Sequence, residues 1–267
     1  MNVLEQALLL MGKRKRFAMA TVIETSGSVP GRVGAKLIYT EEEKPLGSVG
    51  GGKIESEVLK MIPELLENNE SRVLTYHLTK GSQGIGMNCG GTAKVFVEIV
   101  QPRPKLVVCG GGHIGYEVVQ CAQHLDMEIT IIEERKEFAT EERFPHAAQR
   151  IMKPTYGEGL SDVEIDEQTY VVVVTKGSTT DEEVLETILG KPAAYIGLMG
   201  SQRKKIEIMK SLEEKGYQKN LLDQIYCPIG LDLQGGNPAE IALSIMAEVV
   251  SVKNKGKGIS LKEGFSC

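Results

Sequence analysis

The sequence predicts an α/β protein in which a Rossmann-like domain, with a doubly wound parallel sheet, follows a smaller mixed α+β domain. From Lys105 onward, continuous apolar strands alternate with helical stretches, which is typical of a parallel sheet covered on both faces. The segment "LVVCGGGHIG" runs from the end of the first of these strands into a glycine-rich loop. The segment before it, "QPRP", holds two prolines that cannot continue a strand interior.

Domain boundaries follow from these changes in pattern. A chain of 267 residues is long enough for two domains. We expect a first domain over residues 1–100, a linker at residues 101–104, a Rossmann-like domain over residues 105–252 and a flexible tail at residues 253–267. The glycine loop therefore starts late because a separate domain precedes it.

The first domain is expected to open with a helix over "VLEQALLLM". The basic run Lys13–Arg16 is interpreted as the solvated end of that helix, where cations complement the dipole, with a short membrane anchor as the alternative. Strands are predicted over "RFAMATVIETSG", "AKLIYT", "SRVLTYHLT" and "TAKVFVEIV". A glycine run also leads into a helix whose apolar residues share one face: Ile54, Val58, Leu59, Ile62, Leu65 and Leu66.

The second domain is expected to alternate strands with helices. The predicted strands are "KLVVCG", "MEITIIEE", "TYVVVVT" and "AAYIGLMG". The predicted helices are "IGYEVVQCAQHL", "DEEVLETILG", "SQRKKIEIMKSLEEKG" and "NPAEIALSIMAEVVSV". This alternation indicates βαβ units and a parallel sheet.

Composition narrows the classes of function. A net charge of −5 argues against a nucleic-acid-binding protein, which needs a surplus of Lys and Arg. No apolar run approaches the roughly 20 residues that span a bilayer, so no membrane association is expected. The five cysteines form neither a CxxC pair nor a disulfide framework, which favours a reduced, cytoplasmic protein.

The glycine loop matches GxGxxG at Gly110, Gly112 and Gly115, with a strand before it and a helix after it. In such loops the first glycine permits a tight turn, the second lets a pyrophosphate approach and the third packs helix on strand. Glu133, or its neighbour Glu134, ends the next strand and is the candidate acceptor for a ribose diol, which makes NAD a possible cofactor. The alternative is a loop kept for packing alone. His113 is left open between a ligand contact and a structural hydrogen bond.

A resemblance to a known family rests on several motifs taken together. The segments "ATVIETSGSVPGRVGAKLIYT", "GSVGGGKIE" and "GMNCGGTAKVFVE" resemble the N-terminal domain of the xanthine dehydrogenase accessory (XdhC/CoxI) family. The segments "LVVCGGGHIG", "EERKEFATEERFP", "YIGLMGSQRK" and "PIGLDLQGGNPAEIALSIMAEV" resemble its Rossmann domain. The acid that ends the second strand is Glu133, where the family usually carries Asp.

The resemblance implies a chaperone for molybdenum cofactor, a pterin with a dithiolene and a phosphate that is often extended by a nucleotide. Such a protein holds the cofactor between its domains while a cysteine desulfurase replaces an oxo ligand with sulfur. It then delivers the cofactor to a molybdenum hydroxylase of the xanthine dehydrogenase type, an enzyme of purine catabolism. A homodimer is the expected assembly.

Further site residues are expected under this resemblance. Cys89 lies in a glycine-rich segment next to Gly90 and Gly91 and is a candidate molybdenum ligand or sulfur relay. The alternative for Cys89 is a buried structural thiol. The run Gly50, Gly51 and Gly52 is a candidate anion nest. Two polar residues are each left open between a ligand contact and a role at a helix start: Glu55 and Ser201.

Two other classes of function compete with the chaperone hypothesis. A nicotinamide-dependent oxidoreductase would use the glycine loop and Glu133, although no catalytic constellation accompanies them. A nucleotide-sensing binding module without catalysis is the third hypothesis. Whether the protein is an enzyme is therefore left open, with a non-catalytic chaperone preferred.

Overall fold

The structure is a computed structural model that describes residues 2–78 and 90–264. The chain divides into two units, residues 1–102 and 103–267, and each is described by itself. Residues 101–104 form neither helix nor strand, so this short proline-containing segment connects the last strand of the first unit to the first strand of the second.

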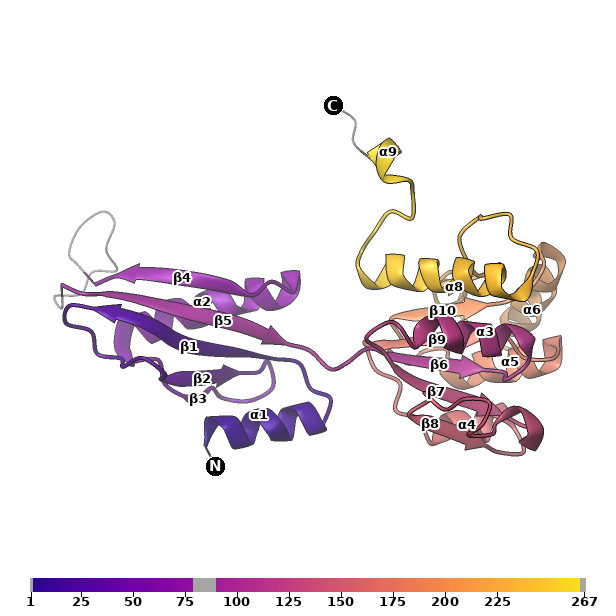
Figure 1. Cartoon of the computed structure of the whole chain (residues 1–267), viewed down its shortest axis with the longest axis horizontal. Helices are drawn as coiled ribbons and strands as arrows, with labels where there is room; N and C mark the ends of the chain where they lie inside the picture. The colour runs from indigo at the N-terminus through magenta and orange to yellow at the C-terminus, as the bar shows by residue number, and fades with distance from the viewer. Residues whose placement is uncertain (1, 79–89, 265–267) are drawn as a thin grey trace. The chain divides into compact units, whose positions relative to one another are not determined.

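The first unit is built on an antiparallel sheet with the strand order β3-β2-β1-β5-β4. Its strands are β1 (Phe17–Ser26), β2 (Lys36–Tyr39), β3 (Leu46–Gly47), β4 (Arg72–His77) and β5 (Thr92–Val100). Helix α2 (Gly52–Asn68) packs on one face of this sheet (Figure 1). Helix α1 (Val3–Gly12) packs its buried residues Ala7 and Leu10 with Phe17 and Ile38 in a separate cluster.

The core of the first unit follows from two periodicities. Alternate residues of β1, Ala18, Ala20 and Val22, are buried, because successive side chains of a strand point to opposite faces. They meet the apolar face of α2, in which Ile54 and Val58 lie one turn apart. The predicted amphipathic helix is therefore confirmed, with Leu59 partly buried beside the same cluster.

The second unit holds a parallel sheet with the strand order β11-β10-β9-β6-β7-β8. Its strands are β6 (Lys105–Cys109), β7 (Glu128–Glu133), β8 (Gln149–Met152), β9 (Thr169–Val173), β10 (Tyr195–Leu198) and β11 (Ile225–Tyr226). Its helices are α3 (His113–Ala122), α4 (Tyr156–Ser161), α5 (Ser178–Ile188), α6 (Gln202–Glu214), α7 (Lys219–Leu222), α8 (Pro238–Lys253) and α9 (Leu261–Gly264), with a 3₁₀ turn, η1, at Lys136–Phe138.

Helices cover both faces of this parallel sheet, as predicted for a doubly wound domain. Val107 and Cys109 of β6 point into a core shared with α4, α5 and α6. Leu106 and Val108 of the same strand point into a second core with α3 and α8, which lie side by side in Figure 1. The strand order reverses between β6 and β9, and ligands of open parallel sheets bind outside the carboxyl ends of the strands at such a reversal.

Candidate functional site

Three glycines of the loop after β6 have different surroundings. Gly110 has a φ of 116°, and a β-carbon there would overlap the carbonyl of Val174. A β-carbon at Gly115 would overlap the carbonyl oxygen of Gly110. At Gly112, by contrast, a β-carbon would meet no described atom within 4 Å, and the backbone has an ordinary φ of −64°. The fold therefore requires glycine at the first and third positions but not at the second.

The two helices that follow the adjacent strands β6 and β9, at the strand-order reversal, begin without a side-chain cap. Gly112 is the N-cap of α3 and Gly177 is the N-cap of α5, and neither helix has a side-chain acceptor for its first amides among the described residues. By contrast, the N-caps of α6 and α8, Ser201 and Asn237, each accept from a backbone amide of the first turn. Uncapped amides and the helix dipole favour an anion. The starts of α3 and α5 are thus the candidate anion-binding positions of this sheet.

Arg143 holds the glycine loop by donating hydrogen bonds to two of its backbone carbonyls. Its Nε donates to the carbonyl of Gly111 at 3.1 Å, and its Nη2 donates to the carbonyl of Gly112 at 3.3 Å. The guanidinium also lies over the rings of Tyr116 and Phe138, with centroids 4.7 and 5.3 Å away. The loop carbonyls are therefore held by a cation next to the place where an anion would approach.

Glu133, the last residue of β7, is buried and accepts hydrogen bonds from several groups of its own chain. Its oxygens accept from the amide of Gly111 at 2.7 Å and from Nε and Nη2 of Arg135 at 3.0 and 2.9 Å. The amides of Glu134 and Arg135 donate at 3.0 Å each, and the hydroxyl of Tyr156 lies 3.4 Å away. A carboxylate offers about four lone-pair positions. These donors therefore saturate the carboxylate.

The pKa of Glu133 reflects this saturation. Burial raises the pKa, but hydrogen bonds from Arg135 and from backbone amides outweigh burial and hold it below the ordinary value of 4.5. A carboxyl whose folded pKa is depressed stabilises the fold above pH 4.5, and that contribution is lost as the pH falls through the folded pKa. The charged form of Glu133 is thus part of what holds the glycine loop against β7.

Replacing Glu133 with glutamine is expected to lower the free energy of unfolding by about 2 kcal/mol, because the new amide group would face N–H donors that now bind a carboxylate. Urea denaturation at neutral pH measures this loss, and the difference from wild type is expected to shrink below pH 4.5. Glu134→Gln is the matched control, since Glu134 pairs with the exposed Lys176 and its loss is expected to cost less than about 1 kcal/mol. Equal losses for both variants would contradict the special role of Glu133.

A second group of polar side chains lies beside the start of α5. Asp181 is fully buried, accepts from the hydroxyl of Thr175 at 2.6 Å and forms an ion pair with Lys204 of α6. Lys204 also donates to the carbonyl of Met199, which follows β10. These contacts fix the loops after β9 and β10 to each other. The frame of the candidate site therefore includes an ion pair whose carboxylate is buried.

In the first unit, the predicted anion nest is filled by a side chain of the same chain. Gly50, Gly51 and Gly52 all have positive φ, as expected for a glycine run that turns into a helix. The Oε2 atom of Glu55 accepts from the amides of Val49 and Gly51 at 3.2 Å each, and from the hydroxyl of Ser48. An external anion would have to displace this carboxylate. The anion nest therefore stays a prediction.

The third glycine loop is described only in part. Gly91 lies against the end of β1, where a β-carbon would overlap the carbonyls of Ser26 and Ser28, whereas a β-carbon at Gly90 would meet no described atom within 4 Å. Cys89 lies outside the described residues, so both of its predicted roles stay predictions. The described residues contain no group of three or more His, Cys, Asp or Glu side chains that could hold a metal ion.

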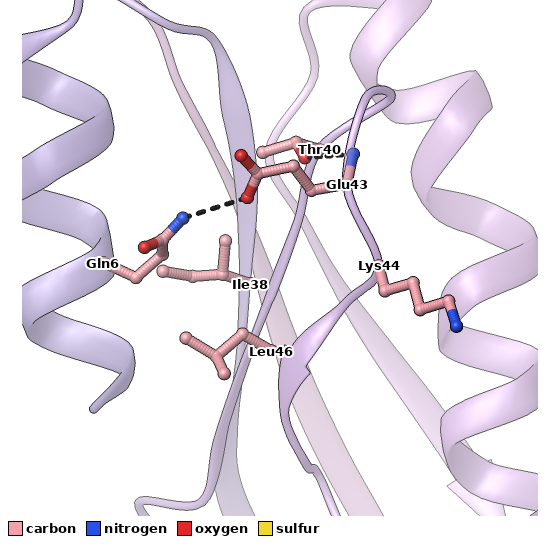
Figure 2. A pocket seen from close by; sticks show the side chains of 6 residues that line it. All are labelled: Gln6, Ile38, Thr40, Glu43, Lys44 and Leu46. Atoms are coloured by element: carbon pink, nitrogen blue, oxygen red, sulfur yellow. Dashed lines mark hydrogen bonds between the residues drawn. The ribbon is translucent and has the colours of Figure 1, made fainter. Parts of the chain in front are cut away.

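A small cavity lies between α1 and the β2–β3 hairpin. It has a volume of about 130 Å³ and is lined by Gln6, Ile38, Thr40, Glu43, Lys44 and Leu46. Figure 2 shows the Gln6 side chain pointing toward Glu43, to which its amide nitrogen donates at 3.2 Å. Ligand pockets are typically about 300–1,000 Å³. This cavity is therefore too small for a cofactor.

The structure brings some predicted site residues together and separates others. Gly110, Gly112, Gly115 and Glu133 meet around the loop after β6, and His113 is the exposed first residue of α3. The glycine run with Glu55 belongs to the other unit. Ser201 caps α6 through the amide of Lys204 at 3.3 Å, which is the structural one of its two predicted roles.

Sequence reasoning missed the charged residues that complete this site: Arg135, Arg143, Asp181 and Lys204. Arg135 and Arg143 lie within "EERKEFATEERFP", a motif that had pointed only to a family resemblance. Arg135 follows Glu133, the acid at the end of a predicted strand, by two residues, and this spacing was a usable signal for an ion pair. The reach of Arg143 back to the glycine loop had no local signal.

No helix of the described residues has both the length and the apolar character needed to cross a membrane.

Two family models match the chain, the XdhC and CoxI family over residues 10–77 and the XdhC Rossmann domain over residues 106–249.

Three curated relatives align over almost the whole chain. Uncharacterized protein YqeB of Escherichia coli is 29% identical over 97% of this chain and 47% of its own length. The molybdenum cofactor insertion chaperone PaoD of Escherichia coli is 22% identical over 94% of this chain and 88% of its own length. A probable xanthine dehydrogenase subunit from Bacillus subtilis is 18% identical over 92% of this chain and 96% of its own length. The chain thus spans about half the length of the first relative.

A solved structure shows the same fold. It is described as a xanthine dehydrogenase from Bacillus halodurans, is 19% identical in sequence and covers 98% of each chain with a TM-score of 0.52.

Proposed function

The chain belongs to the XdhC and CoxI family, and on that basis we propose that it is an accessory protein that binds molybdenum cofactor for a molybdenum hydroxylase of the xanthine dehydrogenase type. Two relatives support the proposal through their names, one a molybdenum cofactor insertion chaperone and the other a probable component of xanthine dehydrogenase. Because the chain spans about half of another relative, the activity and partners of that whole protein are no part of the proposal.

The observation that carries this proposal is the open position at Gly112. Each neighbouring glycine is required by a close contact within the fold, whereas Gly112 leaves space beside the uncapped start of α3. Phosphate is the ligand chemistry that such a helix start favours. The cofactor carries a phosphate on its pterin side chain, so we propose that Gly112 and the backbone amide of His113 hold that phosphate.

The remaining parts of the proposal follow from the family. The cofactor is cargo, and its molybdenum is bound through the dithiolene of the pterin. We propose that the protein keeps the cofactor bound while a cysteine desulfurase supplies sulfur and then passes it to the hydroxylase. Cys89, Gly90 and Gly91 are the proposed contacts on the metal side, and a homodimer is the proposed assembly.

Co-expression with the enzymes of cofactor synthesis is expected to yield protein that carries molybdenum and pterin in a near-equimolar ratio to the chain. Metal analysis by mass spectrometry and fluorescence of the oxidised pterin measure the two components independently. A chain that only packs its glycine loop would retain neither. Absence of both molybdenum and pterin from the purified protein would overturn the proposed function, and pterin without molybdenum would restrict it to the apo-pterin.

A further inference from the structure

The carboxylate of Glu133 occupies the position at which dinucleotide-binding domains place the acid for a ribose diol. Such an acid must have a free oxygen lone pair that points to the ligand. Here the amide of Gly111, both nitrogens of the Arg135 fork, two further amides and the Tyr156 hydroxyl all donate to the two oxygens. Because the carboxylate is also buried, a ribose hydroxyl has neither space nor an acceptor there.

Arg135 is the group that completes this closure. Without its guanidinium, Oε2 of Glu133 would keep only the amide of Gly111, whereas Oε1 would keep its other donors. The guanidinium is held in turn by the ring of Phe138, whose centroid lies 4.0 Å from it. The turn that contains Phe138 packs closely on the glycine loop. Its carbonyl lies so near Gly111 that a β-carbon at that position would overlap it.

The same geometry argues against a phosphorylated dinucleotide. In NADP-binding domains an arginine near the strand end takes the 2′-phosphate. The fork of Arg135 is already used by Glu133, and this negative partner balances its charge. A phosphate would therefore have to compete for the Arg135 guanidinium with the buried Glu133 carboxylate, which accepts two hydrogen bonds from it.

We infer that Arg135 closes the ribose subsite of the second unit, so that its glycine loop binds ligands through a phosphate and excludes the nicotinamide dinucleotides. This inference rests on the proposed function and deepens it, because it selects a cargo whose bound end is a phosphate and not an adenosine ribose. Arg135 is then a specificity-determining residue that acts through Glu133.

Fluorescence titration of the full chain with NADH and NADPH tests the inference. Wild type is expected to bind both only in the millimolar range or not at all. Arg135→Ala frees Oε2 of Glu133 and is expected to tighten NADH binding by at least about tenfold, the gain from one hydrogen bond to a charged group. Arg135→Lys keeps the charge but cannot form the fork, so a smaller gain is expected and it serves if the alanine variant fails to fold.

Two controls make the result specific. Arg103→Ala removes an arginine that lies just before β6 and pairs with the exposed Asp126. NADH affinity is expected to stay at the wild-type level in this variant. Adding Gly112→Val to Arg135→Ala is expected to abolish the gain, which locates NADH on the glycine loop. Calorimetry with inorganic pyrophosphate is expected to give equal affinity for wild type and Arg135→Ala.

Several outcomes would overturn the inference. They are micromolar NADH or NADPH binding by wild type, no gain in either Arg135 variant, and no pyrophosphate binding by wild type. The proposed function is measured separately, through molybdenum and pterin in the co-expressed protein. A wild type that binds NADH and also carries the cofactor would therefore refute the inference alone.

Discussion

Replacing Gly112 with valine is expected to weaken retention of the phosphate-bearing cargo at least about a hundredfold, because the side chain would fill the space next to two backbone donors of α3. Each charge-assisted hydrogen bond contributes about 1.5–3 kcal/mol, so losing two accounts for an effect of this size. The fold is expected to tolerate the change. A β-carbon at this position meets no described atom within 4 Å, and valine at an N-cap costs less than about 1 kcal/mol relative to glycine.

The measurement is the amount of pterin and molybdenum retained per chain after co-expression, together with the unfolding midpoint in urea. Gly12→Val is the matched control, because Gly12 is also open and lies at the end of α1 in the first unit. Gly115→Ala is the opposite case, in which the β-carbon overlaps the carbonyl of Gly110 and stability is expected to fall by at least about 2 kcal/mol. Undiminished retention in Gly112→Val would mean that the loop serves packing alone.

The sequence predicted the fold class because the signals for it are local. The central strands of the second unit are nearly all apolar and buried on both faces, as in the run Tyr170–Val174. The α2 helix of the first unit repeats its apolar residues at helical spacing. Both patterns can be read without knowing what lies on the other side of the core.

Two of the strands that the sequence analysis did not predict, β8 and β11, lack such a pattern. Strand β8 has four residues with exposed or half-buried side chains, and β11 has two residues. Each pairs with a single neighbour at an edge of the sheet. Edge pairing depends on the backbone of the neighbouring strand and leaves little trace in the side chains.

The sequence motif located the glycine loop between β6 and α3, but it did not predict the hydrogen bonds of Glu133. The spacing identifies Glu133 at the end of β7, whereas its saturation depends on contacts with Gly111 and Tyr156, which are distant in sequence. Glu55 is a parallel case, since its carboxylate turns back onto amides of Val49 and Gly51. Sequence motifs locate groups that can bind an anion, and tertiary contacts decide whether the chain already supplies one.

Replacing Asp181 with alanine is expected to lower the free energy of unfolding of the second unit by about 3 kcal/mol. Asp181 is fully buried, and the change would leave the Lys204 ammonium without its anionic partner and would remove one of the hydrogen bonds of the Thr175 hydroxyl. Removing one partner of a buried ion pair typically costs about 3–5 kcal/mol. The lower end applies because the Lys204 side chain is 23% exposed and water can reach it.

Lys204→Met and the double variant complete a thermodynamic cycle for this pair. Lysine and methionine have similar stems, so the methionine variant removes the charge while preserving most of the packing. If the loss in Asp181→Ala comes from an uncompensated cation, the double variant will be more stable than the sum of the single losses predicts, by about 1–3 kcal/mol. Additive losses in urea denaturation would instead assign the effect to the Thr175 hydrogen bond and to packing. Because the pair joins the loops after β9 and β10, its loss is also expected to loosen the start of α5 beside the glycine loop.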